Sequence, residues 1–340
     1  MNRVPLSFYD HLCDISTTDE LGTAKELSGY YGKIALFAFE HCVEYLVDIV
    51  DGREEDGYLA YFCDGREVRE LEKIEAFPKK FVRVVTINLM DAKDEKVSRE
   101  LIQRFPYSRY DFTCFSSSIN NAWVDLAYSL KRLGRVGIIE TLKDGALQLF
   151  QKLVMGQKLI RLSMHVNACN DSTIKVSKTL FCQDQFKELK IMSGGGKNWD
   201  SAAILKILEF WSKNGEKLRG KALVLGNNWD GVIQLENFLK ERKTSTLPGN
   251  QFDIENVLKP CSKEECDFIK MEYNDNLYTF EKPSCFYKFE EGDEGNERRL
   301  YVSFECAQEV TWEPETLPSY FGQKCPSLMR KTTCLHVLFG

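Results

Sequence analysis

Residues 81–89 read FVRVVTINL, and they begin a series of short β-type runs that alternate with helical runs as far as residue 242. The later runs are RYDFTCFS (109–116), RVGIIETL (135–142), KLIRLSMH (158–165), QFKELKIM (185–192) and KALVL (221–225). Between their central residues Val85, Phe112, Ile138, Leu162, Leu189 and Leu223 the spacings are 27, 26, 24, 27 and 34 residues. This period is typical of a leucine-rich-repeat-like solenoid, so each repeat is predicted to be a strand followed by a helix.

The segments between these runs carry apolar residues at helical spacing. Residues 123–130, 146–153 and 204–211 each place apolar side chains at i, i+3, i+4 and i+7, which buries one face of a helix. Residues suited to cap the helices are Asn120, Asn121, Asp144, Asn198 and Asp200 at the starts, and Gly134 and Gly220 at the ends.

Alternating strands and helices also specify a doubly wound parallel sheet. A strand covered on both faces is nearly all apolar, whereas the runs at 81–89 and 185–192 mix charged and polar residues with apolar ones. We therefore favour an irregular βα solenoid over residues 81–243, and the doubly wound sheet is the competing interpretation.

The chain changes character after the turn-rich connector KTSTLPGN at 243–250. Runs at 267–273, 276–281, 285–290 and 299–305 alternate between apolar and polar residues and are separated by turn residues, which predicts antiparallel hairpins. Residues 251–340 are therefore expected to form a β-rich C-terminal module that caps the solenoid. Within it, 307–340 contains Pro314, Pro318 and Pro326 and is expected to be irregular.

The charge of the chain is concentrated at its start. The 340 residues include 45 basic and 51 acidic side chains, a net charge of −6, which offers no basic field for nucleic acid or an anionic membrane. Residues 1–57 hold 12 acidic and 4 basic residues (net −8), so the remainder holds 39 and 41 (net +2). We expect an acidic head at 1–50, joined by a linker at 51–80 to the repeat domain.

The twelve cysteines lack the spacing of a metal site. They include no C-x-x-C pair, and Cys261 with Cys266 is the one close pair, whereas a zinc site needs two. We expect them to be reduced and mostly buried. The first residues lack a secretory apolar run, and no stretch reaches the length of a membrane span. These features predict a protein of the reducing cytoplasm or the nucleus.

Few residues suggest catalysis. The run SGGGK at 193–197 resembles a phosphate-binding turn, but Asn198 and Trp199 follow the lysine where a P-loop has Ser or Thr, and the first glycine is missing. The four histidines, His11, His41, His165 and His336, form no H-x-x-x-H pair, and no G-x-S-x-G elbow occurs. We therefore expect no intrinsic enzyme activity, no cofactor and no metal.

Residues 4–40 carry short helical patterns rather than a βα repeat. Val4-Pro5 is followed, at fixed intervals, by Leu12, Glu20-Leu21, Leu27, Tyr31 and Ile34-Ala35. This order resembles the F-box, and several later runs are similar to the region that follows it in nematode-expanded F-box families. The resemblance implies a helical head that docks onto the Skp-type adaptor of an SCF-type cullin–RING ubiquitin ligase.

Carried over by position, the adaptor-binding residues implied by the resemblance are Val4, Pro5, Phe8, Leu12 and Leu27. Tyr31, Ile34 and Ala35 would hold the head together. The resemblance further implies that the region after the head recruits a target protein, whose identity the sequence does not reveal, for ubiquitination by partner proteins.

A different interpretation is a non-catalytic binding scaffold, or a partner that neutralises another protein, with a degenerate F-box and no ligase role. It rests on Val4, Ser16 and Tyr31, where the F-box pattern has Leu, an apolar residue and Trp.

Overall fold

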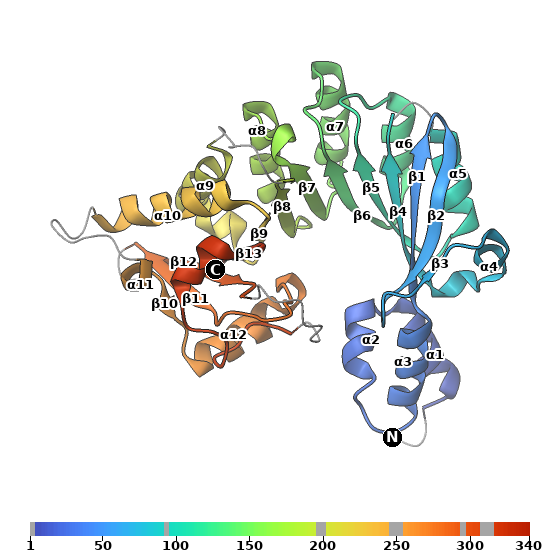
Figure 1. The fold of residues 1–340 in the computed structure, drawn as a ribbon, viewed down its shortest axis with the longest axis horizontal. Helices are drawn as coiled ribbons and strands as arrows, with labels where there is room; N and C mark the ends of the chain where they lie inside the picture. Colours follow the sequence, from blue (N-terminus) through green and yellow to red (C-terminus); the bar gives the residue numbers. More distant parts are fainter. Residues whose placement is uncertain (1–3, 92–94, 195–201, 245–253, 293–296, 307–315) are drawn as a thin grey trace. The chain divides into compact units, whose positions relative to one another are not determined.

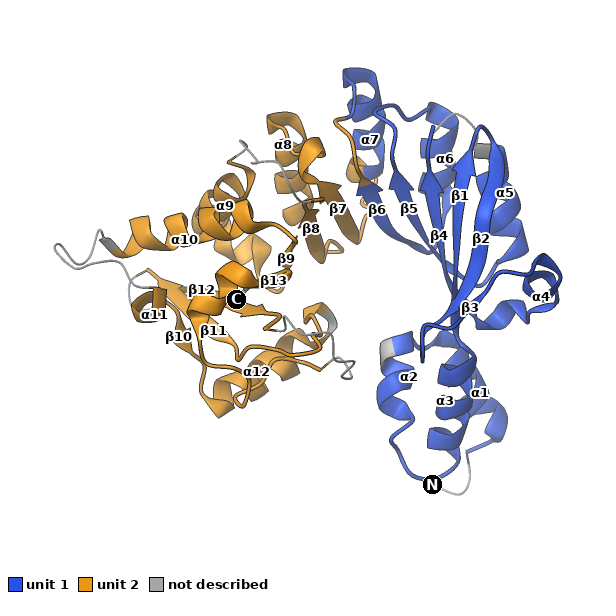
Figure 2. Cartoon of the chain, in the orientation of Figure 1, with its two compact units in different colours: residues 1–137, 142–153 blue, residues 138–141, 154–340 orange. Residues whose placement is uncertain are grey.

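A computed structural model describes residues 4–91, 95–194, 202–244, 254–292, 297–306 and 316–340. The chain forms two compact units (Figure 2). Unit 1 comprises residues 1–137 and 142–153, and unit 2 comprises residues 138–141 and 154–340. Both are mixed α/β structures.

Unit 1 begins with three short helices and continues into a sheet (Figure 1). The helices of this head are α1 (Leu6–Ile15), α2 (Thr18–Ala24) and α3 (Tyr30–His41). The strands are β1 (Val43–Val50), β2 (Arg53–Tyr61), β3 (Glu67–Val68), β4 (Val82–Leu89), β5 (Arg109–Cys114) and β6 (Leu133–Ile138). The other helices are α4 (Leu71–Ala76), η1 (Lys79–Phe81), α5 (Glu95–Arg104), α6 (Asn121–Ser129) and α7 (Asp144–Met155).

The strands of unit 1 lie in the order β6-β5-β4-β1-β2-β3. β4 is parallel to both β1 and β5, whereas β1 and β2 are antiparallel. The strands β4, β5 and β6 are neighbours in the sheet in chain order, and α5 and α6 lie in the connections between them.

The expected linker at 51–80 differs from the structure. Asp51 and Gly52 have φ angles of 48° and 70°, which form the tight turn of a β1–β2 hairpin. The rest of this segment forms β2, β3, α4 and η1. The expected head at 1–50 likewise ends in strand β1, which lies inside the sheet between β4 and β2.

Unit 2 combines a parallel and an antiparallel part. Its strands are β7 (Arg161–His165), β8 (Glu188–Met192), β9 (Ala222–Gly226), β10 (Lys259–Pro260), β11 (Tyr287–Glu291), β12 (Arg298–Phe304) and β13 (Cys334–Phe339). Its helices are η2 (Val166–Ala168), α8 (Asp171–Phe181), α9 (Ala203–Leu218), α10 (Trp229–Thr244), α11 (Ile254–Val257), α12 (Lys263–Tyr273), η3 (Asn274–Asn276) and η4 (Pro326–Lys331). The order is β10-β11-β12-β13-β9-β8-β7, with β7, β8 and β9 parallel and the others antiparallel to their neighbours.

The alternation of strands and helices over 81–243 is confirmed. All six β-type runs overlap strands β4 to β9, and the three helical stripes lie in α6, α7 and α9. Asn120 caps α6 by accepting a hydrogen bond from the N–H of Trp123 (2.7 Å), and Gly220 has a φ of 76° after α9. Gly134, expected to end a helix, lies inside β6 instead. The predicted caps Asn198 and Asp200 fall outside the described residues.

The C-terminal region is less β-rich than expected. The hairpin predicted at 285–290 and 299–305 is present as β11 and β12. Residues 267–273 were predicted as a strand, but they belong to α12, whose start is fixed by a capping box between Ser262 and Glu265. The alternation there is also a helical stripe, because Cys266, Ile269 and Tyr273 are all buried.

The segment 307–340, expected to be irregular, contains strand β13. Residues Leu335–Phe339 of β13 are buried, because the strand lies between β9 and β12. The C-terminal strands therefore continue the sheet of β7, β8 and β9, and they are not a separate capping module.

Candidate functional site

The head is held together by a small apolar core. Buried Cys13 of α1, Leu21 and Ala24 of α2, and Ala35, Ala38 and Cys42 at α3 form one cluster, against which Tyr31, Ile34 and Phe39 pack. Tyr31, Ile34 and Ala35 therefore lie where they were expected to hold the helices together. Burial is the main reason why the pKa of the Cys13 thiol and of the Cys42 thiol is raised. Both thiols therefore stay protonated at neutral pH and act as small apolar groups.

Local signals fix the ends of the head helices. Pro5 precedes α1, which ends where the N–H and the hydroxyl of Ser16 both donate to the carbonyl oxygen of Leu12 (3.0 and 2.9 Å). Thr17 and Glu20 form a capping box at the start of α2: each side chain accepts a hydrogen bond from the other residue's backbone N–H (3.2 and 2.6 Å). The polar residue at 16 therefore has a local structural role.

Arg83 of β4 joins the head to the sheet of unit 1. Its guanidinium donates to the carbonyl oxygens of Cys13 (2.8 Å) and Asp14 (2.5 Å) at the C-terminal end of α1, and to the sulfur of Cys42 (3.3 Å). A cation at a helix C-terminus satisfies free carbonyl groups and interacts favourably with the helix dipole.

Most of the expected adaptor-binding residues are exposed. Val4 is 41% exposed, Phe8 55% and Leu27 56%, and Pro5 is also exposed. Leu12 differs, because it is half-buried on α1. Further large apolar side chains of the head are exposed that the resemblance did not indicate: Leu6, Ile15, Tyr30, Leu36 and Phe37.

These exposed side chains are numerous for so small a head. Soluble domains seldom leave many large apolar residues in water unless a partner covers them. Helical spacing could have identified part of the set, since Phe8, Leu12 and Ile15 lie at i, i+4 and i+7 on one side of α1.

One face of the unit 1 sheet carries a second group of polar residues. Asp111 of β5 is 3% exposed, and its carboxylate accepts hydrogen bonds from the backbone N–H (3.0 Å) and the guanidinium (3.1 Å) of Arg135. On β1, Glu44 accepts a hydrogen bond from the hydroxyl of Thr86 in β4, and burial raises the pKa of Glu44. The carboxylates of Asp111 and Glu44 are thus each hydrogen-bonded to a neighbouring strand, which gives them a structural role.

Adjacent carboxylates occur at Glu54-Glu55-Asp56 and at Glu264-Glu265, and one residue of each run has a structural partner. Glu54 lies in β2 and pairs with Arg104 of α5 (3.0 Å). Glu265 belongs to the capping box of α12 and also pairs with Lys288 of β11. Neither forms a pair of facing carboxylates for general acid and base catalysis.

Two of the four histidines, His165 and His336, make structural contacts. His165 Nε2 accepts a hydrogen bond from the N–H of Gly194 (3.0 Å), and the glycine run beyond it, from Gly195, lies outside the described residues. His336 is 1% exposed in β13, and its Nε2 donates to the carbonyl oxygen of Asn276 (3.1 Å). Burial lowers the pKa of His336 to about 4, which keeps the ring neutral.

Over the described ranges, no three His, Cys, Asp or Glu side chains are grouped in a way that could hold a metal ion. None of the helices that the structure describes is both long and apolar enough to cross a bilayer. Comparison with protein families, with curated proteins and with solved structures finds no match for this chain.

Proposed function

We propose that this protein is a substrate-recognition subunit of an SCF-type cullin–RING ubiquitin ligase. In this proposal the head binds a Skp-type adaptor, the βα repeats and the strands after them bind a target protein, and partner proteins carry out ubiquitination. The observation that carries the proposal is the exposure of Val4, Pro5, Phe8 and Leu27 on a small helical head that has its own core.

The geometry of the head supports this assignment. The residues with F-box-like spacing fall on the three head helices or directly beside them. Two positions of the pattern, Leu21 and Ala35, are fully buried at 0% exposure. The positions that the resemblance assigns to the adaptor lie outside the core, and Leu12 alone among them is half-buried. The head thus has a buried apolar core and exposed apolar side chains outside it, which supports the proposal.

The order of the strands supports a repeat array behind the head. β4, β5 and β6 are neighbours in chain order in unit 1, and β7, β8 and β9 are neighbours in chain order in unit 2. A βα solenoid adds each strand beside the last one, as happens from β4 to β6 and from β7 to β9. The strand order of unit 1 does reverse between β1 and β4, but β1, β2 and β3 are antiparallel neighbours and not the parallel βα units of a doubly wound sheet. We therefore favour the irregular leucine-rich-repeat-like interpretation for this part of the chain.

Co-purification with a Skp-type adaptor tests the proposal. The unmodified full chain should retain the adaptor, and a Phe8→Asp/Leu27→Asp variant should lose about tenfold or more in affinity, because two charges would be placed in an apolar contact. Pro5→Ala/Leu12→Ala is expected to weaken binding in the same direction.

A matched control is Met155→Asp on α7, where the native side chain is 74% exposed but lies outside the head. This control should bind the adaptor like the unmodified chain, and all variants should keep their melting temperature. No adaptor recovered from the unmodified chain, or equal recovery from it and from both head variants, would contradict the proposal.

The second candidate function is a binding scaffold or neutralising partner without ligase activity. The half-buried position of Leu12 favours it, because a contact residue of the adaptor would then be partly withdrawn from solvent. In that case the chain would be a monomer without adaptor, and the cellular level of its partner would not change when the proteasome is inhibited.

A further inference from the structure

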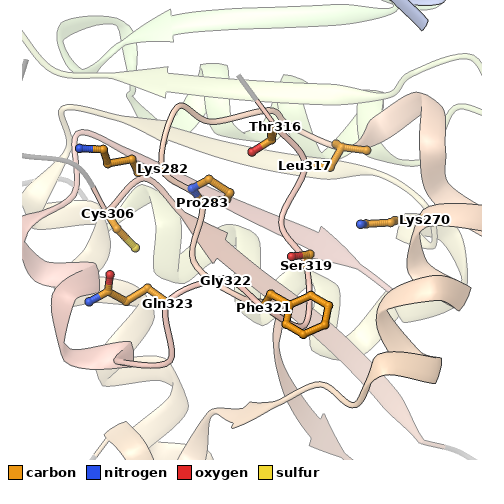
Figure 3. Close-up of a pocket in the computed structure, with 10 residues that line it drawn as sticks. All are labelled: Lys270, Lys282, Pro283, Cys306, Thr316, Leu317, Ser319, Phe321, Gly322 and Gln323. Atoms are coloured by element: carbon orange, nitrogen blue, oxygen red, sulfur yellow. The ribbon is translucent and has the colours of Figure 1, made fainter. Parts of the chain in front are cut away.

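An open cavity of about 750 Å³ lies in unit 2, beside the start of β11 (Figure 3). Helix α12 contributes Lys270, and the segment before β11 contributes Lys282 and Pro283. The remaining wall comes from Cys306 after β12 and from the segment 316–323, which includes Thr316, Leu317, Ser319, Phe321, Gly322 and Gln323. In Figure 3 the Lys270 side chain points toward Ser319, with Phe321 close by.

Backbone hydrogen bonds hold the loop that carries Phe321 at both ends. Thr316 pairs with Phe280 in an antiparallel bridge (2.7 and 2.9 Å), and Gln323 accepts hydrogen bonds from the N–H of Cys285 (3.2 Å) and the hydroxyl of Tyr287 (3.1 Å). The loop is therefore fixed to the sheet before any partner arrives.

A tight turn presents the aromatic residues at the tip of this loop. The N–H of Gly322 donates to the carbonyl oxygen of Ser319 (3.0 Å), which leaves Tyr320 and Phe321 at the two central positions. Gly322 itself packs against the chain, because a Cβ there would lie 2.4 Å from the backbone of Ser284. The exposed aromatic tip is thus enforced by the packing of its base.

Phe321 is 86% exposed, the largest fraction among the large apolar side chains of the described residues. Burying a phenylalanine side chain is favourable, so a loop that keeps Phe321 in water leaves a large apolar surface available for a partner. Rigid aromatic residues beside a pocket are typical anchors of protein interfaces, because little side-chain entropy is lost when they bind.

The charges around Phe321 are positive. Lys270 and Lys282 line the cavity, and the ammonium group of Lys324 lies 3.9 Å from the centre of the Tyr320 ring. Among the described residues that line the cavity none is acidic. The carboxylate of Glu305, which acts on the Cys306 thiol, accepts hydrogen bonds from the backbone N–H groups of Glu281 and Lys282 (2.8 and 2.9 Å).

Among the described residues that line the cavity, the one thiol is not an activated nucleophile. Burial raises the pKa of the Cys306 thiol to about 12, so this sulfur is protonated at neutral pH and is a poor nucleophile. The other polar side chains in the described lining are the ammonium groups of Lys270 and Lys282, the hydroxyl groups of Thr316 and Ser319 and the amide of Gln323. The described residues that line the cavity are therefore suited to binding a ligand.

We propose that this cavity binds an acidic peptide segment of the target protein, with one apolar side chain of that segment packed on Phe321 and its carboxylates beside Lys270 and Lys324. The proposal rests on the proposed function and names the target-binding site that it requires. Charge complementarity selects an acidic segment, and the exposed phenyl ring selects an apolar residue next to the acidic ones.

Selection from a library of random twelve-residue peptides displayed on phage tests this site. The purified full chain, without adaptor, should enrich peptides that combine Asp or Glu with a neighbouring aromatic or aliphatic residue. The most enriched peptide, labelled with fluorescein, then serves as the probe in fluorescence polarisation. Phe321→Ala and Lys270→Glu/Lys324→Glu should each lower its affinity about tenfold or more, and added salt should weaken binding to the unmodified chain.

Matched controls are Tyr107→Ala, an aromatic residue 60% exposed in unit 1, and Lys131→Glu, an exposed lysine between α6 and β6. Both should bind the probe like the unmodified chain. Failure to enrich acidic peptides, or equal affinity in the cavity variants and the controls, would overturn the proposal. Tight binding of a twenty-residue oligothymidine that is lost in the lysine variants would also overturn it, in favour of a nucleic-acid site.

The two proposals can fail separately. Phe321→Ala should still co-purify with the Skp-type adaptor, and Phe8→Asp/Leu27→Asp should still bind the peptide probe. Loss of adaptor binding alone refutes the ligase assignment, and loss of peptide binding alone, in the unmodified chain, refutes the cavity as the target site.

Discussion

Gly32 sets the shape of the head through a close contact between backbones. A Cβ atom at this position would lie 1.8 Å from the carbonyl oxygen of Leu27. The first turn of α3 can therefore lie against the chain that leaves α2 only because residue 32 has no side chain. The same contact fixes the backbone of Leu27, one of the exposed residues assigned to the adaptor.

The variant Gly32→Ala is expected to destabilise unit 1 by about 2 kcal/mol, because the backbone around Leu27 must move to relieve the clash. Chemical denaturation measures this change. The control is Gly145→Ala in the first turn of α7, where a Cβ meets nothing within 4 Å. This control should be neutral or slightly stabilising, since alanine favours the helix by up to about 1 kcal/mol over glycine. Equal stability of the two variants would show that the close contact is unimportant.

His336 makes the stability of unit 2 depend on pH. The pKa of its ring is lowered to about 4 by burial, from 6.5 in an exposed histidine. Below pH 6.5 the histidine of the unfolded chain becomes protonated, whereas the buried ring of the folded chain becomes protonated only near pH 4. Lowering the pH through this window therefore reduces the free energy of unfolding, and the reduction levels off below pH 4.

We expect the free energy of unfolding of unit 2 to fall by about 2 kcal/mol between pH 7.5 and pH 5 because of this histidine. The measurement is urea denaturation at several pH values, compared with His336→Gln, whose amide can still donate to the carbonyl oxygen of Asn276. The variant should lose less stability than the unmodified chain over this window. Parallel curves for both proteins would refute a buried neutral ring.

Helix ends decide where the exposed apolar residues of the head lie. α1 and α2 are separated by Ser16 and Thr17 alone, and both residues use their side chains to end one helix or begin the next. Such short connections leave little freedom for the angle between the helices. The positions of Phe8 and Leu12 on α1 relative to the rest of the head depend on these two caps.

Thr17→Ala should destabilise the head by about 1 kcal/mol, because the N–H of Glu20 loses its acceptor and the capping box is broken. Amide hydrogen exchange of residues 18–21 should become faster. Thr17→Ser keeps the hydroxyl oxygen and is the control, for which exchange should stay close to that of the unmodified chain. Fast exchange in both would mean that the hydroxyl contributes nothing to α2.

Local pattern predicted the elements of the repeat region well. The helices α6, α7 and α9 were identified because one face of each is buried at helical spacing, and the strands β4 to β9 because their short apolar runs are buried, β9 at every position. α12 was predicted as a strand because seven residues of its stripe also fit an alternating pattern. The capping box at Ser262 and Glu265 was the signal that could have corrected this prediction.

At the scale of the whole chain, pairings between distant segments limited what the sequence could predict. β1 pairs in parallel with β4, with Val43 opposite Val82, and this pairing places β1 inside the sheet of unit 1. β2 pairs with β1, so the acidic stretch that was predicted to be a linker is part of the same sheet. β13 lies between β9 and β12 for the same kind of reason, although proline-rich sequence precedes it. A local sequence pattern does not show which distant strand lies beside a given strand in the sheet.

The residues that we propose to be functional differ in the same way in how far the sequence could predict them. The exposed positions of the head could be predicted, because a spacing within forty residues carries the resemblance to the F-box. The cavity could not, since Lys270, Lys282 and Phe321 come from separate segments that only the sheet brings together. Gly322 was its one local signal, as a glycine after two aromatic residues indicates a turn with an exposed tip.

The place of β13 also bears on how the protein is made. A ribosome releases β9 long before it has synthesised residues 334–339, and until then the apolar β9, ALVLG, has an open edge. The antiparallel strands β11 and β12 emerge earlier than the strand that connects them to β9. During synthesis the nascent chain thus exposes two unpaired strand edges, which are prone to join other chains. Unit 2 must complete its sheet after translation of its final strand, so its folding is expected to depend on chaperones more than that of unit 1.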